Sequence, residues 1–372
     1  MRRRARSVVV GLAALVLAAC GPAARTTVSA TSPPAVGALT LLDSSWTSPQ
    51  AGWVLADGSC GGALCAVVLH TTDRAATWRR VAAPADPSLT GLRFVDGHIG
   101  YAMSASAVYL TTDGARTWHR VGAPALVEDL ETSGRSVVLV GADSSGCPGP
   151  CNAYVLTATA GTATWHTLPA PAIAQGVRDD VSVQGSSLVL AAYGQTAGGA
   201  GLAHTRLARS SDGGATWSTA ADPCRTGPEG EDDTTAVTSA PGGVVAVLCV
   251  PRTAQFSPPF VLLSADGGAT FGARRRLPLA VQGSSVVLAL GAGAAGDLSV
   301  AALDGSRYVV LVSHNGGANW THSLSVPAPS EGAAGAFVTY SDATHAALGF
   351  QTGSLWTTAD GGDTWTASMP KA

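Results

Sequence analysis

The sequence predicts an all-β fold, a single seven-bladed β-propeller with four antiparallel strands in each blade. Three observations predict it. One eight-residue pattern returns along the chain, and two strand-like runs precede it each time. Glycine (45) and proline (21) are frequent among the 372 residues, and only 13% of the residues are charged, which is typical of short strands joined by tight turns.

The repeated pattern, here called the octet, reads Ser/Thr, any residue, Asp, any, Gly, any, Thr and an aromatic residue. Successive copies start 40 to 54 residues apart. Seven copies at this period indicate a repeat architecture, and four-stranded units of this length are propeller blades. Six clear copies and one worn copy occupy 71–78, 111–118, 158–165 (worn, keeping only Thr164 and Trp165), 210–217, 264–271, 313–320 and 358–365.

The second unit shows the expected order of strands. Alternating or apolar segments at 89–96, 99–104 and 107–112 predict its first three strands, and 117–121 predicts the fourth. The octet then forms the turn between the third and fourth strands. The first unit has a first strand and the last unit has a fourth, but the sequence leaves open whether the ring closes without exchanging a strand.

The residue types of the octet suit a turn. Its Asp can accept hydrogen bonds from the backbone N–H groups that follow, and glycine adopts the positive φ that other residues resist. The aromatic residue starts the fourth strand and offers a large apolar face to a neighbouring blade. We therefore predict structural roles for Asp73, Asp113, Asp212, Asp266, Asn315 and Asp360, and for Trp78, Trp118, Trp165, Trp217, Phe271, Trp320 and Trp365.

The N-terminus predicts export and lipidation. Four arginines within the first six residues precede an apolar run at 8–19, which is too short to span a bilayer as a mature helix. The run ends in Leu-Ala-Ala-Cys, which resembles the lipobox of bacterial lipoproteins. We predict a signal peptide (1–19), acylation of Cys20, a flexible tether (20–37) and the propeller (38–370), on the extracellular or periplasmic side of the membrane. A chance cysteine at an ordinary cleavage site is the alternative.

The other six of the seven cysteines form an even set, as expected of an exported protein. Two pairs have short spacings suited to tight turns, and the third brackets an acidic loop. Zinc binding is the less favoured alternative, because no histidine joins the short pairs at a familiar ligand spacing. We predict disulfides, each worth about 2–4 kcal/mol, between Cys60 and Cys65, Cys147 and Cys151, and Cys224 and Cys249.

The octet resembles the Asp-box, or bacterial neuraminidase repeat. Families with this repeat include sialidases, two-propeller xyloglucan-cleaving glycosidases, sortilin receptors and photosystem II assembly-factor propellers. The single propeller, the glycine-rich octets and the strands at 52–58 and 99–105 are most similar to the assembly-factor type. In these families the box lies on a turn away from the central ligand-binding face, so the resemblance implies a structural role for the octets.

A sialidase-like enzyme, by the same resemblance, has three arginines for a carboxylate, a Tyr–Glu nucleophile pair, an acid/base Asp and an Arg-Ile-Pro motif near the first blade. This chain has no Arg-Ile-Pro, and its Arg276-Leu277-Pro278 follows the fifth of the seven copies, at 264–271, far from the first blade. Tyr340 is a candidate nucleophile, although tyrosine is common in strands. We predict no catalytic residues.

A glycosidase needs two carboxylates roughly 5–10 Å apart. We interpret the charges at 128–131 and 178–180 as solvated loop residues, each glutamate as a loop residue with no identifiable partner, and the acidic run at 229–233 as a solvated loop rather than a Ca²⁺ site. We predict no metal and no cofactor. The candidate carboxylates outside the octets are Asp57, Asp96, Asp129, Asp179, Asp180 and Asp342, and the five glutamates interpreted as loop residues are Glu128, Glu131, Glu229, Glu231 and Glu331.

We therefore favour a monomeric, lipid-anchored binding or assembly module that performs no chemistry and recognises an unknown protein or glycan. A net charge of −3 without a basic stripe argues against nucleic acid. The alternatives are a glycoside hydrolase, either an exo-α-sialidase or another Asp-box glycosidase, and a structural envelope protein without a discrete ligand. Any site should lie among the less repetitive loops on the side of the ring away from the octets.

Overall fold

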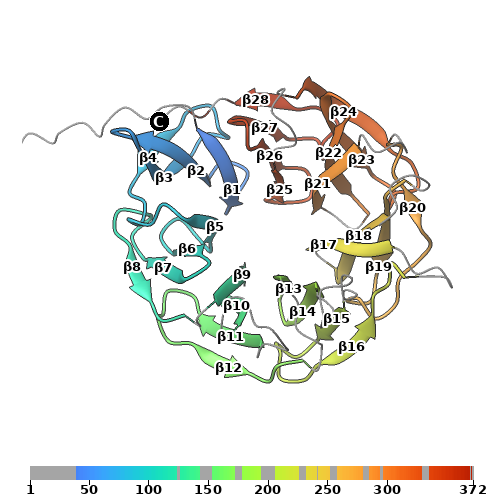
Figure 1. Cartoon of the computed structure of the whole chain (residues 1–372), viewed down its shortest axis with the longest axis horizontal. Coiled ribbons are helices and arrows are strands. Elements are labelled where there is room, and N and C mark those ends of the chain that lie inside the picture. The colour runs from blue at the N-terminus through green and yellow to red at the C-terminus, as the bar shows by residue number, and fades with distance from the viewer. Residues whose placement is uncertain are drawn as a thin grey trace, which may run out of the picture. The chain divides into compact units, whose positions relative to one another are not determined.

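The computed structural model describes residues 39–123, 126–142, 153–171, 178–193, 206–225, 232–240, 242–251, 258–279, 285–293, 296–328, 335–368 and 370. These residues form a ring of seven four-stranded sheets around a central channel (Figure 1). Every paired strand runs antiparallel to its neighbour, so the predicted fold class is confirmed. Among the described residues, no helix is long and apolar enough to cross a membrane.

Each blade consists of four consecutive strands, with the first strand innermost (Figure 1). The strands of the second unit fall where the sequence predicted them. From the inside outward, the seven blades are β1 (Thr40–Trp46), β2 (Gly52–Cys60), β3 (Ala63–Thr71) and β4 (Arg79–Val81); β5 (Leu89–Phe94), β6 (Gly100–Ser104), β7 (Ala107–Thr111) and β8 (His119–Val121); β9 (Leu126–Ser133), β10 (Ser136–Ala142), β11 (Ala153–Thr159) and β12 (His166–Leu168); β13 (Arg178–Gln184), β14 (Ser187–Tyr193), β15 (Arg206–Ser210) and β16 (Ser218–Ala221); β17 (Asp232–Ala240), β18 (Val244–Pro251), β19 (Phe260–Ser264) and β20 (Arg275–Arg276); β21 (Ser285–Ala292), β22 (Leu298–Asp304), β23 (Arg307–Ser313) and β24 (Thr321–Pro327); β25 (Ala336–Tyr340), β26 (Ala346–Phe350), β27 (Ser354–Thr358) and β28 (Thr366–Ser368).

The core lies between the faces of neighbouring blades. Second strands such as β6 and β26 are buried at every residue, because neighbouring blades pack against both faces of their sheet. Aromatic pairs join adjacent blades: Trp53 of β2 stacks on Phe94 of β5 at 3.8 Å between ring centroids, and Tyr308 of β23 stacks on Phe350 of β26 at 4.3 Å. Apolar contact between whole sheets therefore holds the ring together.

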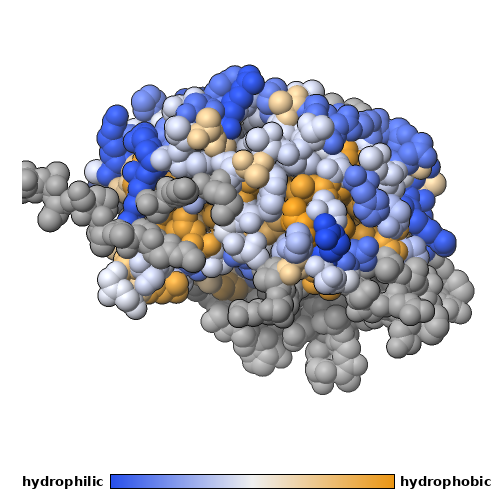
Figure 2. All heavy atoms as spheres, turned by 90° about the horizontal axis from the view of Figure 1, so that it is seen from above, coloured by the Kyte–Doolittle hydropathy of each residue, from blue (hydrophilic) through white to orange (hydrophobic). Residues whose placement is uncertain are grey.

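The outer wall of the ring is mixed in character. Figure 2 shows hydrophilic side chains along one rim of this wall and hydrophobic atoms at the surface below that rim. Most outermost strands are short, with three residues each in β4, β8 and β12, whereas β24 has seven. His119 and His166, which follow octet tryptophans, are exposed. Short edge strands with charged residues present little unpaired backbone for association with other chains.

The octets form the turn between the third and fourth strands, as predicted. At 210–217, Ser210 Oγ donates to Asp212 Oδ1 (2.7 Å), while the Thr216 N–H and hydroxyl donate to Oδ1 (2.9 Å) and Oδ2 (2.5 Å). The other four octets with Asp repeat these bonds. In the remaining clear octet Asn315 accepts the bonds to Oδ1. The Asp therefore acts as the hub of the turn.

The fourth octet residue ties this turn to the turn between the first two strands of the same blade. Its N–H donates to a carbonyl there in every clear octet, for example from Gly213 to Ser186 (2.8 Å) and from Gly361 to Thr344 (2.8 Å). In the worn copy the third residue, Ala160, donates instead to Arg135 (2.8 Å). Both kinds of turn therefore lie on one face of the ring, here called the octet face.

The octet tryptophan packs on the outermost strand of the preceding blade. Trp365 Nε1 donates to Ser323 Oγ of β24 (3.1 Å), and Trp118 Nε1 donates to the Ala82 carbonyl just after β4 (2.8 Å). Trp78 makes the corresponding contact across the ring closure, donating to Ser368 Oγ of β28 (3.0 Å). Since no sheet borrows a strand, the ring closes through side chains, which answers the question that the sequence left open.

Two predicted disulfides are confirmed, Cys60–Cys65 and Cys224–Cys249. The first closes the β2–β3 hairpin, and the second joins the segment after β16 to β18 of the next blade. The Cys147–Cys151 pair, the lipidation site Cys20, and the whole predicted signal peptide and tether lie outside the described residues.

Candidate binding site in the central channel

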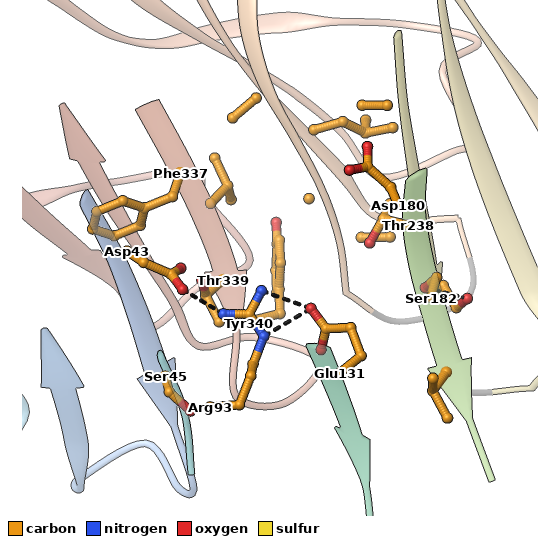
Figure 3. A pocket seen from close by; sticks show the side chains of 18 of the residues that line it. Asp43, Ser45, Arg93, Glu131, Asp180, Ser182, Thr238, Phe337, Thr339 and Tyr340 are labelled. Atoms are coloured by element: carbon orange, nitrogen blue, oxygen red, sulfur yellow. Dashed lines mark hydrogen bonds and ion pairs between the residues drawn. The ribbon is translucent and has the colours of Figure 1, made fainter. Parts of the chain in front are cut away.

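The innermost strands of all seven blades line one cavity of about 490 Å³ at the centre of the ring. Its charged residues come from four adjacent blades, on strands β1, β5, β9 and β13 (Figure 3). Blades five to seven contribute mainly Ala, Val, Leu and Phe with a few hydroxyl groups. The cavity is therefore two-sided, with a charged wall opposite a largely apolar wall. The charged members are Asp43, Arg93, Asp129, Glu131 and Asp180.

Arg93 is held between two carboxylates. Its Nη1 lies 2.5 Å from Asp43 Oδ2, and its Nη2 and Nε lie 2.6 and 2.7 Å from Glu131 Oε1. The three side chains are only 23%, 13% and 27% exposed, in the order Arg93, Asp43 and Glu131. Burial by itself would lower the pKa of Arg93, but these carboxylates raise it well above its usual value. Arg93 is thus a fixed positive charge in the channel wall.

Asp129 has the most perturbed carboxyl of the channel. Burial, followed by the neighbouring charges of Glu131 and Asp180, raises its pKa to about 8, although Arg93 and the Val181 N–H act in the opposite direction. Its Oδ2 accepts the Val181 N–H (2.9 Å) from the next blade. A carboxyl that keeps its proton beside other carboxyl groups is an arrangement found in acid catalysis, so Asp129 is the channel residue best suited to act as a general acid.

Asp43 and Asp129 make the same pair of backbone contacts. Asp43 accepts the N–H of its successor Ser44 (2.8 Å) and of Leu92 in the next blade (2.8 Å). Asp129 accepts the N–H of its own successor (2.8 Å) and of Val181 (2.9 Å). Both aspartates directly follow a register shift in the innermost strand. Since the contact repeats between blades one and two and between blades three and four, its first role is to join blades.

The charged wall opens toward the face opposite the octets. A second cavity of about 420 Å³ is also lined by Asp43, Arg93, Asp129 and Asp180. Its further lining comes from the starts of β5 and β9 and the end of β6, which lie on that opposite face. The cavity geometry thus places the charged wall on the side where the sequence analysis expected a site.

The apolar wall contains Tyr340, the candidate nucleophile. Its hydroxyl lies 2.5 Å from Ser299 Oγ, and burial raises the pKa of the phenol to about 12. A tyrosine nucleophile must lose its proton, and this environment favours the protonated form. The structure therefore gives Tyr340 a packing and hydrogen-bonding role in the channel wall.

Two sequence interpretations were wrong. The charges at 128–131 and 178–180 lie on the innermost strands β9 and β13, not in solvated loops. Glu131 also has a partner, Arg93, 38 residues earlier in the chain. The error has a physical cause: these strands alternate polar and apolar residues, but their polar side faces an enclosed channel rather than bulk solvent.

The remaining candidates are dispersed. Asp96 and Asp342 cap backbone N–H groups in the turns after the first strands of blades two and seven. Asp57 lies on β2, where burial raises its pKa. Arg276 lies on the outermost strand β20. No group of three metal-binding side chains occurs in the described part of the chain. The side chains of Asp179, Glu229, Glu231 and Glu331 lie outside it.

Arg93 was not among the site residues predicted from the sequence. A signal existed, because an arginine between Leu92 and Phe94 is unusual in an otherwise apolar innermost strand. The sequence could not show that Arg93 lies beside Glu131. These two residues hold equivalent positions, each two residues beyond the one that follows the register shift of its strand, β5 or β9.

Comparison with known proteins supports the fold. The chain shares its fold with YCF48, solved bound to a D1 peptide. That match has a TM-score of 0.59 and 17% identity, and covers 90% of this chain and 99% of the other. A polysaccharide lyase of family PL25, an ulvan lyase, matches with a TM-score of 0.53 and 10% identity over 91% and 98% of the two chains. An ancestral GH74 enzyme matches with a TM-score of 0.55 and 10% identity over 90% of this chain and 46% of its own.

These likenesses support the propeller fold. The same fold occurs in a peptide-bound protein and in glycan-acting enzymes. No protein-family model matches the sequence. No curated protein matches it either. The choice between binding and chemistry therefore depends on the channel itself.

Proposed function

We propose that this chain is a lipid-anchored, extracytoplasmic propeller of the Asp-box type, related to assembly-factor propellers, and that it binds a protein partner through the central channel. The octet turns support the Asp-box assignment, since their Asp and Ser/Thr residues form one repeated hydrogen-bond network. The leader sequence ending at Cys20 supports the anchor. Incorporation of labelled fatty acid that disappears in Cys20→Ala tests the anchor directly.

One observation carries the binding proposal. Among the described residues, the channel wall holds one guanidinium, paired with Asp43 and Glu131, and four carboxyl groups, of which Asp129 keeps its proton up to about pH 8. The surplus is negative, so a Lys or Arg side chain is the ligand group that best complements it. The facing apolar wall around Phe337 suits the stem of such a side chain. An extended, cationic peptide segment fits both walls.

The comparison with YCF48 agrees with this proposal, because that propeller was solved with a peptide bound. The two chains are only 17% identical, so we infer the ligand class of this chain from its own channel residues and not from the likeness.

Selection from a random peptide library against the purified chain tests the proposal. We expect enriched peptides to carry Lys or Arg and to bind Asp180→Asn at least about tenfold more weakly, the loss expected for a desolvated charge contact. Asp96→Asn on the octet face is the matched control and should bind like the wild type. Enriched peptides without a cation, or equal binding by Asp180→Asn, would contradict the proposal.

Glycoside hydrolysis is the second candidate, and the raised pKa of Asp129 near Glu131 and Asp180 is the observation that favours it. We prefer binding because Asp129 is engaged as a blade-joining residue in the same way as Asp43. Incubation with fluorogenic sialosides and glucosides decides between them. Turnover that Asp129→Asn abolishes while the fold persists would establish the enzyme.

A further inference from the structure

A separate cavity of about 210 Å³ lies on the octet face, at the seam where the last blade meets the first. It has one charged wall residue from the first blade, Arg74 of the octet at 71–78, and an aromatic one, Trp46. The last blade supplies hydroxyl groups from β27 and β28. Apart from Trp46, its lining is not shared with the central channel. We propose that this seam pocket binds an oxyanion, specifically a carboxylate carried by a small apolar group.

Arg74 stands where the five other clear octets have glycine. It is the fourth octet residue, with φ of 59°, and the equivalent residue of the five other clear octets is a glycine with φ between 68° and 74°. This backbone conformation is unfavourable for an arginine. The arginine nevertheless keeps the repeated turn contact, since its N–H donates to the Gln50 carbonyl (3.1 Å). The turn contact therefore uses only the backbone N–H of residue 74, and the turn does not need the arginine side chain.

The guanidinium of Arg74 has no partner within the described part of the chain, unlike that of Arg93. Its neighbour Asp73 is committed to the octet turn, where both carboxylate oxygens accept bonds from Thr77. On the opposite side of the pocket, His345 Nδ1 is bound to Asp342 (2.9 Å). An arginine that lines a pocket and has no carboxylate partner in the described protein is suited to bind the carboxylate of a ligand.

The rest of the pocket supports a ligand with both polar and apolar parts. The hydroxyls of Thr357 and Thr366 line it and make no hydrogen bond to another described residue, so both can donate to an oxyanion. Trp46 forms the apolar wall, and its ring meets Trp78 edge-to-face at 6.2 Å. A Cβ atom at Gly52 would collide with the Trp46 ring, so the indole lies directly on the backbone and is held rigidly.

Titration of the full chain with N-acetyl-phenylalanine tests this inference, with the uncharged N-acetyl-phenylalanine amide as the matched probe. We expect the carboxylate, but not the amide, to shift the indole resonance of Trp46. Phenyl phosphate separates the sources of the oxyanion: a shift like that caused by the carboxylate supports a general oxyanion site, and its absence supports carboxylate selectivity.

Arg74→Gly is the decisive variant, because it restores the residue that the turn prefers. We expect it to fold with unchanged or higher thermal stability and to bind the carboxylate at least tenfold more weakly. Ala75→Gly changes the next positive-φ residue of the same turn (φ 63°) but keeps the arginine, and should still bind. Wild-type protein that gives no shift at millimolar carboxylate, or Arg74→Gly that binds as the wild type does, would overturn the proposal. Neither result depends on whether the central channel binds a peptide.

Discussion

Arg93 determines the charge balance of the central channel. It lies between Asp43 and Glu131, which come from the blades on either side of its own. A single guanidinium thus joins three blades and offsets charges that would otherwise repel one another. Asp129, next to this group, keeps its proton up to a higher pH, because burial and then the neighbouring Glu131 and Asp180 raise its pKa.

Replacing Arg93 with alanine should destabilise the fold by about 1–3 kcal/mol at neutral pH, less than for a fully buried pair because the side chains are partly exposed. Arg93→Met, which keeps the aliphatic stem but removes the charge, should lose nearly as much. Urea unfolding at neutral pH measures this. Arg116→Ala, an exposed arginine on an octet turn, is the control and should change little. Wild-type stability in Arg93→Met would contradict the electrostatic explanation.

The pKa of Asp129 predicts a pH dependence of stability. Because its folded pKa is raised from 3.8 to about 8, the unfolded chain loses this proton first as the pH rises. The free energy of unfolding should therefore fall between about pH 4 and pH 8 through this group. Asp129→Asn, which keeps an oxygen for the Val181 N–H, should remove that part of the slope. Unfolding titrations across the range test it, and an unchanged slope would show that Asp129 is not the group responsible.

At the scale of the element, the octet turn is a unit that repeats with local substitutions. Six clear copies keep the Asp or Asn hub, while the fourth residue varies from glycine to Arg74 and the second residue is free to vary. One such variation, His314 in the sixth blade, links two blades. Its Nδ1 and Nε2 each lie 3.0 Å from a carboxylate, Asp297 of its own blade and Asp363 of the last blade.

This histidine should make the contact between blades six and seven sensitive to pH. The hydrogen bond with Asp363, and then that with Asp297, outweigh burial and raise the pKa of His314. Its contribution to stability is therefore complete below the unfolded value of about 6.5 and is lost as the pH rises through the folded pKa. Since the ring is 44% exposed, the effect should stay below about 1 kcal/mol.

Comparison of wild type and His314→Ala by chemical unfolding from pH 5 to pH 9 measures this contribution. The difference between them should be largest at low pH and should vanish at high pH. His322→Ala, an exposed histidine on β24, serves as the control. A difference that does not vary with pH would mean that His314 acts only through packing.

At the scale of the whole molecule, the ring is closed by side chains. Trp78 and Ser368 join the first and last blades, and Ser368 Oγ in turn donates to the Ala75 carbonyl (2.7 Å). On the inner side, Ser44 Oγ lies 3.2 Å from Thr339 Oγ1. The seam is therefore built like the other blade contacts and is not a special strand exchange.

Trp78→Phe should lower stability by about 1–2 kcal/mol, because it removes the hydrogen bond to Ser368 and part of the packed indole ring. Trp78→Ala should lower it by about 3 kcal/mol through lost packing. Trp118→Phe, the equivalent change inside the ring, should match Trp78→Phe, and unfolding should stay a single transition in all three. A much larger loss at Trp78 than at Trp118 would show that the seam is the weakest contact of the ring.

The sequence by itself determined the blades, because the octet turn depends on local chemistry. Hydroxyl, carboxylate and glycine must follow one another at set positions, so the turns and their seven-fold repetition can be recognised in the chain. The same holds for Cys60 and Cys65, which are only five residues apart. Tertiary structure alone decided the site. Arg93 meets Asp43 and Glu131 because of strand register and ring closure, which depend on contacts between blades far apart in the chain. Burial in the shared channel then shifts the pKa of Asp129, and no local pattern records that enclosure.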